Sequence, residues 1–196
     1  MSISERLRYI IIHKPYGVLC TFTDPENRPT LSQLIAVPEQ VYAAGRLDLD
    51  SEGLLFLTND GWVNHRLTHP RYKLPKTYLV QVEGIPTPEA LQALRQGVVI
   101  KGERTAPAEV DALAAPPTLP PRTYPVTPHG PTHWLRIILH EGRKRQVRHM
   151  TASVGLPTLR LVRVAIGPLL LGALTPGVWR DLRPDEVRTL RQALSH

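Results

Sequence analysis

Apolar residues gather in short runs separated by turn-forming residues, a pattern typical of buried strands. Residues 9–12 (YIII) and 54–57 (LLFL) are continuous apolar runs that are followed by Pro-Tyr-Gly and Asn-Asp-Gly sequences. Residues 76–84 alternate instead, which predicts a half-buried strand with Tyr78 on its more apolar side. The apolar run 18–22 is expected to pair with 9–12 or to lie close to it. Further strands are expected at 98–100, 134–140, 159–164 and 177–182.

Helix signals lie between these runs. Thr87 as N-cap, Pro88 at the first helical position and Gly97 as terminator predict a helix over the intervening residues. Thr30 with Gln33 matches a capping box and predicts a short helix over 31–35. Helices are also expected over 62–67, from about 144 to 154, and from Pro184 to the C-terminal end.

Strands outnumber helices and do not alternate with them one for one. This favours an α+β fold with a largely antiparallel mixed sheet and flanking helices over a doubly wound nucleotide-binding fold. Residues 114–131 are rich in proline and predict a long surface loop. We expect one domain over residues 1–196, with two lobes joined near 114–131 as a variant of that arrangement.

The charge is positive and unevenly distributed. The 196 residues carry a net charge of +7, and both 62–80 and 140–163 are strongly basic. Such clustering favours a polyanionic partner, although a solvated basic face is the simpler reading. No stretch approaches the roughly 20 apolar residues of a membrane helix, and the single cysteine, Cys20, is expected to be a small core residue. A cytoplasmic protein is therefore predicted.

The acidic turn at residues 45–53 is the first candidate for chemistry. Asp48 and Asp50 flank one leucine and point to the same side of an extended segment, where a cation is needed to offset their repulsion. Arg46, or an arginine from elsewhere in the chain, is a candidate for that cation. A turn in which Asp48 merely caps backbone amides is the alternative. The spacing also imitates the first half of an EF-hand, but Asn59 stands where the bidentate Glu belongs, so calcium is discounted.

A second candidate is the basic sequence at residues 140–150, HEGRKRQVRHM. A helix that begins among Arg143, Lys144 and Arg145 would bind a phosphate through its amides and guanidinium groups. The alternative is an exposed basic face, with Arg148 partly buried beside the apolar stripe. Zinc is disfavoured because no third ligand accompanies His65 and His69, and no nucleotide-binding motif is present.

Five motifs occur in one order along the chain: residues 12–18 (IHKPYGV), 45–61 (GRLDLDSEGLLFLTNDG), 76–78 (KTY), 141–148 (EGRKRQVR) and 159–163 (LRLVR). In that order they resemble the RNA pseudouridine synthases, in particular the branch that modifies ribosomal RNA. Many members of this branch begin with a small S4 RNA-binding domain, for which no room is expected before the strand at residue 9.

The resemblance implies isomerisation of a uridine in ribosomal RNA, most simply of the large subunit, by a monomer without cofactor or metal. Asp48 would act on the ribose, Tyr78 would stack on the flipped uracil, and Arg148 would pair with Asp48. Arg46 would fill the space left by the base. The residues implied in RNA binding are Arg46, Lys76, Arg143, Lys144 and Arg145.

Two other functions remain compatible with the residues alone. A non-catalytic RNA-binding or ribosome-assembly module would use the same basic surface with a structural Asp48. A glycosidase acting on small nucleosides is disfavoured, because an uncharged substrate has little use for such a surface.

Overall fold

The computed structural model of the chain describes residues 6–38, 40–69, 71–72 and 74–195. The strands are β1 (Tyr9–Lys14), β2 (Tyr42–Ala43), β3 (Glu52–Thr58), β4 (Lys76–Glu83), β5 (Val99–Ile100), β6 (Glu103–Arg104), β7 (Glu109–Ala112), β8 (Thr132–Leu139), β9 (Thr158–Ile166), β10 (Leu169–Leu170) and β11 (Trp179–Asp181). The helices are α1 (Gly61–Thr68), α2 (Pro88–Gln96), α3 (Gln146–Ser153), α4 (Pro184–Ala193) and the 3₁₀ helix η1 (Leu31–Gln33).

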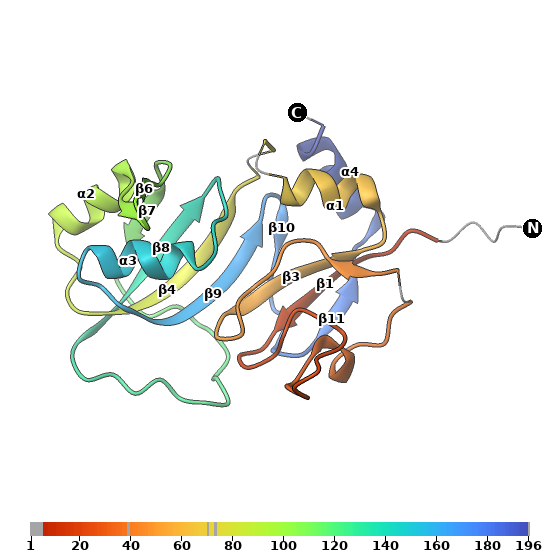
Figure 1. The fold of residues 1–196 in the computed structure, drawn as a ribbon, viewed down its shortest axis with the longest axis horizontal. Helices are drawn as coiled ribbons and strands as arrows, with labels where there is room; N and C mark the ends of the chain where they lie inside the picture. Colours follow the sequence, from red (N-terminus) through yellow and green to blue (C-terminus); the bar gives the residue numbers. More distant parts are fainter. Residues whose placement is uncertain (1–5, 39, 70, 73, 196) are drawn as a thin grey trace, which may run out of the picture.

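One sheet runs through both halves of the molecule, in the order β11-β1-β3-β9-β4-β8-β7 (Figure 1). All its neighbours are antiparallel except β3 and β9, which are parallel. Helices α1 and α4 lie together over one end, and α2 and α3 lie at the other (Figure 1). The predicted α+β class and the largely antiparallel sheet are therefore confirmed. Across the described ranges, no helix has the length and apolar character needed to span a membrane.

The two continuous apolar runs are buried on both faces of the sheet. In β1, Ile11 joins the cluster beneath α1 and α4, whereas Ile10 and Ile12 join the cluster around η1. In β3, Phe56 joins the cluster beneath α1 and α4, whereas Leu55 joins the cluster around η1. Because successive side chains of a strand point to opposite faces, a strand covered on both sides has no polar positions. The run 18–22 is not a strand, but its Val18 and Cys20 pack against the same η1 cluster.

Most helix signals act as predicted, and two do not. The Thr87 hydroxyl accepts from Ala90 N at 3.2 Å, as predicted. Asp60, which was not identified as a cap from the sequence, caps α1 through Trp62 N at 3.0 Å. The capping box at Thr30 is wrong, because its hydroxyl bonds Ser32 Oγ at 2.8 Å and makes no cap bond to the backbone.

The start of α3 also differs from the prediction. The helix begins at Gln146 instead of residue 144, because Arg145 is left-handed, with φ of 56°. The basic residues before it therefore belong to a loop. Val147 and Met150 are buried as the apolar stripe predicted.

The proline-rich segment between β7 and β8 is irregular, as predicted, and extends along one edge of the molecule (Figure 1). It is tied down at several points. Arg160 donates to the carbonyl of Pro120 at 2.9 Å, and the N–H of His129 donates to Glu83 at 2.7 Å. The short strand β7, which pairs with β8, was not anticipated from the sequence.

β3 and β9 meet where one residue has no side chain. The pairing spans Glu52 with Val162 and Gly53 with Arg163. Gly53 has φ of 104°, and a Cβ added there would lie 2.7 Å from the backbone nitrogen of Arg163 and closer still to its carbonyl oxygen. Only glycine fits both the conformation and the space.

Replacing this glycine should destabilise the protein. Gly53→Ala is expected to lower the free energy of unfolding by about 3 kcal/mol, from left-handed strain and overlap with the β9 backbone. Urea unfolding followed by circular dichroism measures the change. Gly61→Ala is the matched control, because nothing lies within 4 Å of its added Cβ. Equal stabilities of the two variants would contradict the proposed constraint.

Candidate active site

The loop between β2 and β3 carries the acidic turn. The N–H of Ser51 donates to the carbonyl of Asp48 at 3.0 Å, which closes a tight turn immediately before β3. The Asp48 side chain is 34% exposed. It lines a cleft of about 730 Å³, which is large enough for a nucleotide-sized ligand.

The cleft gathers side chains from both basic segments and from β4. Every predicted site residue except Arg148 lines it: Arg46, Asp48, Lys76, Tyr78, Arg143, Lys144 and Arg145. The loop before β3 and the loop before α3 form opposing walls, although they are almost a hundred residues apart in sequence. The acidic turn at residues 45–53 and the basic sequence at residues 140–150, which are separate in the sequence, thus line the same cleft.

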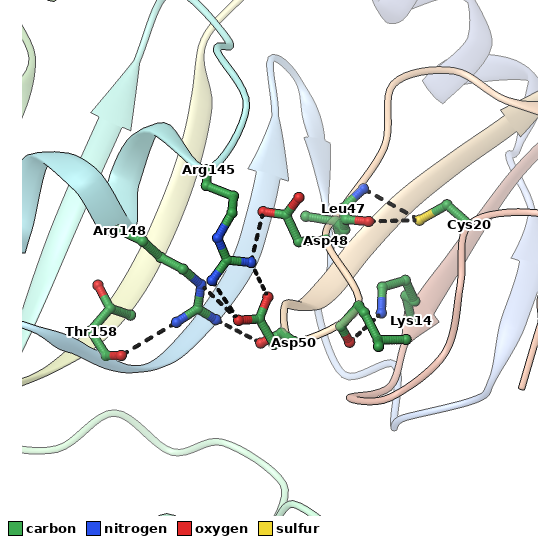
Figure 2. A network of polar contacts seen from close by, with 9 residues as sticks. Lys14, Cys20, Leu47, Asp48, Asp50, Arg145, Arg148 and Thr158 are labelled. Carbon is green, nitrogen blue, oxygen red and sulfur yellow. Dashed lines mark hydrogen bonds and ion pairs between the residues drawn. The ribbon is translucent and has the colours of Figure 1, made fainter. Parts of the chain in front are cut away.

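Arg145 connects these walls. Its guanidinium donates to both carboxylate oxygens of Asp50, at 2.9 and 2.8 Å, and lies 3.9 Å from Asp48 (Figure 2). This bidentate geometry is the strong form of an arginine–carboxylate contact. Asp50 is therefore the acid that is fully paired, and Asp48 keeps a looser contact with the same cation.

The predicted pair between Arg148 and Asp48 is wrong. Arg148 lies 3.3 Å from the Asp50 carboxylate and donates to the Asp50 carbonyl at 2.7 Å and to the Thr158 carbonyl at 3.3 Å (Figure 2). Its side chain is only 13% exposed and does not line the cleft. Which carboxylate Arg148 contacts depends on how α3 packs against the turn, and sequence spacing does not encode that packing.

These contacts set the charge of the turn. Burial raises the pKa of Asp50, but the hydrogen bonds from Arg145 and the charges of Arg148 and Arg145 outweigh it, so the pKa lies below its usual value. Burial lowers the pKa of Arg148 below its ordinary range, against the opposing charge of Asp50. An arginine nevertheless stays protonated at neutral pH. The Asp50 carboxylate is thus ionised, and it is the cation-offset acid that the sequence required.

Two side chains from the N-terminal segment hold the backbone on either side of Asp48. Lys14 is fully buried and donates through Nζ to the carbonyls of Pro15, Val18 and Leu49, at 2.9, 2.6 and 3.4 Å. Cys20 exchanges two contacts of 3.3 Å with the N–H and carbonyl of Leu47. Both anchors are visible in Figure 2. From the sequence, Cys20 was correctly predicted to be a core residue, but the anchoring of the turn was missed, because Lys14 and Cys20 reach Leu49 and Leu47, which are 35 and 27 residues away.

The far end of the turn is anchored in the sheet. Arg160 makes a buried bidentate pair with Glu52, at 2.9 Å for both bonds, and Arg163 donates to the Leu54 carbonyl at 2.8 Å. With Glu52 and Asp50 both bound to arginines, the turn offers no set of free carboxylates. Within the described residues, no group of three His, Cys, Asp or Glu side chains is placed to hold a metal ion.

The remaining cleft residues differ in how firmly they are held. Tyr78 is half-buried and packs against the α2–α3 core while it lines the cleft. Burial and the charge of Arg163 lower the pKa of Lys76. Arg143 lies 3.3 Å from Glu103 and donates to the Arg104 carbonyl at 2.9 Å. The side chain of Lys144 is exposed.

A cleft lined by many basic side chains, with the carboxylates of Asp48 and Glu141 among them and built on an α+β sheet, is the kind of site that binds a polyanion. The chain belongs to the RNA pseudouridylate synthase family, whose model matches residues 8–153. Family members act on RNA, and the basic walls of the cleft agree with such a substrate.

Individual relatives match most of the chain. It is 55% identical over 188 residues to ribosomal large subunit pseudouridine synthase E of Xanthomonas campestris pv. campestris, covering 94% of this chain and 98% of that protein. The protein of the same name from Vibrio vulnificus is 52% identical over 184 residues, covering 93% and 77%. A solved pseudouridylate synthase structure superposes with a TM-score of 0.79 at 30% identity, covering 97% of this chain and 76% of the other.

The burial of Lys14 makes stability depend on pH. Desolvation lowers the pKa of Lys14 from 10.5 to about 8, so between these values the unfolded chain binds a proton that the folded protein has released. The free energy of unfolding should therefore rise with pH in this window, by roughly 3 kcal/mol relative to Lys14→Met.

Urea unfolding of wild type and Lys14→Met at about pH 7 and about pH 10 tests this linkage. The difference between the two proteins removes the titrations that they share. A difference that stays constant over this range would mean that Lys14 keeps an ordinary pKa in the folded state.

Proposed function

We propose that the protein isomerises a specific uridine of large-subunit ribosomal RNA to pseudouridine. The observation that carries the proposal is the position of Asp48, an accessible carboxylate on an anchored turn inside a basic cleft. Family membership and the names of the relatives support the same reaction. The substrate is a polyanion, and the arginines and lysines that line the cleft suit its phosphates.

Asp48 is proposed to act on the ribose of the target nucleotide. The bond between uracil N1 and ribose C1′ breaks, the base rotates, and a bond forms between C5 and C1′. C5 loses a proton and N1 gains one, so substrate and product have the same composition and no oxidant or cofactor is consumed. Asp48 either attacks C1′ or removes a ribose proton, and both roles need an ionised carboxylate next to the sugar.

Arg145 and Arg148 are proposed to have different roles, Arg145 next to Asp48 and Arg148 farther from it. Arg145 is the cation closest to Asp48, so it takes the pairing role first assigned to Arg148. Arg148 then becomes a positioning residue, because it fixes Asp50 and the turn through buried contacts.

Base flipping brings the uridine to Asp48. A uracil inside a stacked helix cannot present its glycosidic bond to the turn, so the nucleotide has to leave its stack. Tyr78 offers a half-buried ring on the cleft wall for the flipped uracil. Arg46 is exposed on the turn and is proposed to occupy the vacated space.

We further propose that the chain works as one catalytic domain and as a monomer. A single sheet joins both halves, and the cleft is lined by residues from both of them. A ribosomal RNA substrate would place the enzyme in the cytoplasm, where ribosomes assemble.

Replacing the proposed nucleophile should abolish product formation. Asp48→Asn is isosteric but cannot ionise, so the rate should fall by roughly a thousandfold or more. The measurement is carbodiimide modification and primer extension on large-subunit ribosomal RNA incubated with each protein.

Asp111→Asn is the matched control, because this carboxylate pairs with Arg136 on the outer strands and does not line the cleft. It should give the wild-type stop. Full turnover by Asp48→Asn would remove Asp48 from the mechanism. RNA binding by wild type without any new stop would favour a non-catalytic RNA-binding module.

Lys144 should contribute a phosphate contact. Its exposed ammonium lines the cleft, so Lys144→Ala should weaken RNA binding and reduce the slope of log K against log salt by about 0.7 to 0.9. Binding titrations over a salt series measure the slope. Lys101→Ala, on the turn between β5 and β6 and outside the cleft lining, should leave it unchanged. Equal slopes for all three proteins would exclude a Lys144–phosphate contact.

A further inference from the structure

A cluster of rings and one cation surrounds the C-terminal end of α1. We call His65, Arg66, His69 and Tyr72 the α1 rim. The ring centroids of its aromatic members lie 5.0 to 6.0 Å apart. The Arg66 guanidinium stacks over Tyr72 at 4.7 Å and over Trp62 at 4.6 Å. Rings and guanidinium thus form a continuous stacked assembly.

The inner end of this assembly is part of the cleft. His69 and Tyr72 line the same cleft as Asp48 and Tyr78. His69 is exposed, and its Nδ1 accepts a hydrogen bond from the N–H of Arg71 at 3.2 Å, which orients the ring. Arg66 is stacked against Tyr72 and so supports that ring from one side.

The charge around the rim is uniformly positive. Residues 62–80 contain four arginines and lysines and no acid. In the described part of the chain Arg66 donates to a backbone carbonyl, that of Leu194, and stacks on two rings. Positive charge combined with accessible aromatic faces is the combination that binds single-stranded nucleic acids, because every base has a face that can stack.

We propose that the α1 rim is a stacking subsite for an unpaired base adjacent to the target uridine. The inference rests on the proposed function in one respect, that the ligand of the cleft is RNA. A flipped nucleotide leaves its neighbours without a stacking partner, and a ring at the cleft wall replaces the lost contact. Tyr72 thereby holds the strand next to the target whatever its sequence, whereas Tyr78 is assigned to the target base itself.

The test compares single-stranded and double-stranded RNA by fluorescence anisotropy. The probes are a dye-labelled oligouridylate and the duplex that it forms with oligoadenylate. Tyr72→Ala should weaken binding of the single strand by about tenfold, and Tyr72→Phe, which keeps the ring, should stay within about twofold of wild type. Duplex binding should not change. Tyr42→Ala, an exposed tyrosine outside the cleft lining, is the control.

Unchanged single-strand affinity of Tyr72→Ala would overturn the proposal, as would an equal loss for single strand and duplex. Should Tyr72→Ala fail to fold, His69→Ala removes an exposed ring of the same rim, and its single-strand affinity decides between the same outcomes. The assay needs no catalysis. If the wild-type protein makes no pseudouridine but Tyr72→Ala still weakens single-strand binding, the proposed function is refuted and the stacking subsite is supported.

Discussion

The contact between β3 and β9 at Gly53 is the constraint on which the site depends. It joins two groups of antiparallel strands through one short parallel pairing. β3 follows the acidic turn directly, and β9 follows α3, so this pairing fixes how the turn faces the helix. The buried pair of Arg160 with Glu52 reinforces the same junction from the side chains. A small shift here would separate Asp48 from Arg145, although neither residue belongs to the junction.

The turn carries three carboxylates that would repel one another, and arginines pair with two of them. Asp50 and Glu52 are each bound by a bidentate arginine, and Asp48 at the start of the turn remains accessible. Burying a charged pair does not by itself stabilise a fold, because the desolvation cost is comparable to the attraction. The Arg160–Glu52 pair is buried, whereas the Arg145–Asp50 pair is 37% and 31% exposed, and an exposed pair contributes little to stability. Both pairs therefore serve placement more than stability, because they hold the backbone so that Asp48 faces the cleft without a tight partner.

Features that depend on local sequence pattern, such as strands and a helix cap, were predicted, whereas side-chain contacts between distant segments were not. The strands at 9–12, 54–57 and 76–84 follow from periodicity, and the cap at Thr87 follows from side-chain chemistry. The choice of Asp50 as partner for Arg148 depends on the approach of α3 to the turn across the sheet. The left-handed Arg145 and the anchoring of Leu47 by Cys20 have no sequence signal either. All the predicted site residues except Arg148 line one cleft, and which of them form pairs is evident only from the tertiary structure.

The basic side chains of the loop before α3 are already held by partners within the protein, which affects how the loop binds RNA. Arg143 is held by Glu103, Arg145 by Asp50, and Gln146 accepts from the Arg143 N–H at 2.9 Å. These side chains are already ordered, so a ligand avoids an entropic cost of about 0.5 to 1.5 kcal/mol for each one it would otherwise immobilise. The side chains of Arg143 and Arg145 remain 33% and 37% exposed, so each guanidinium can contact a phosphate while its carboxylate stays bound. An RNA that makes several such contacts at once saves this cost at each of them, whereas a small anion that touches one guanidinium saves it once.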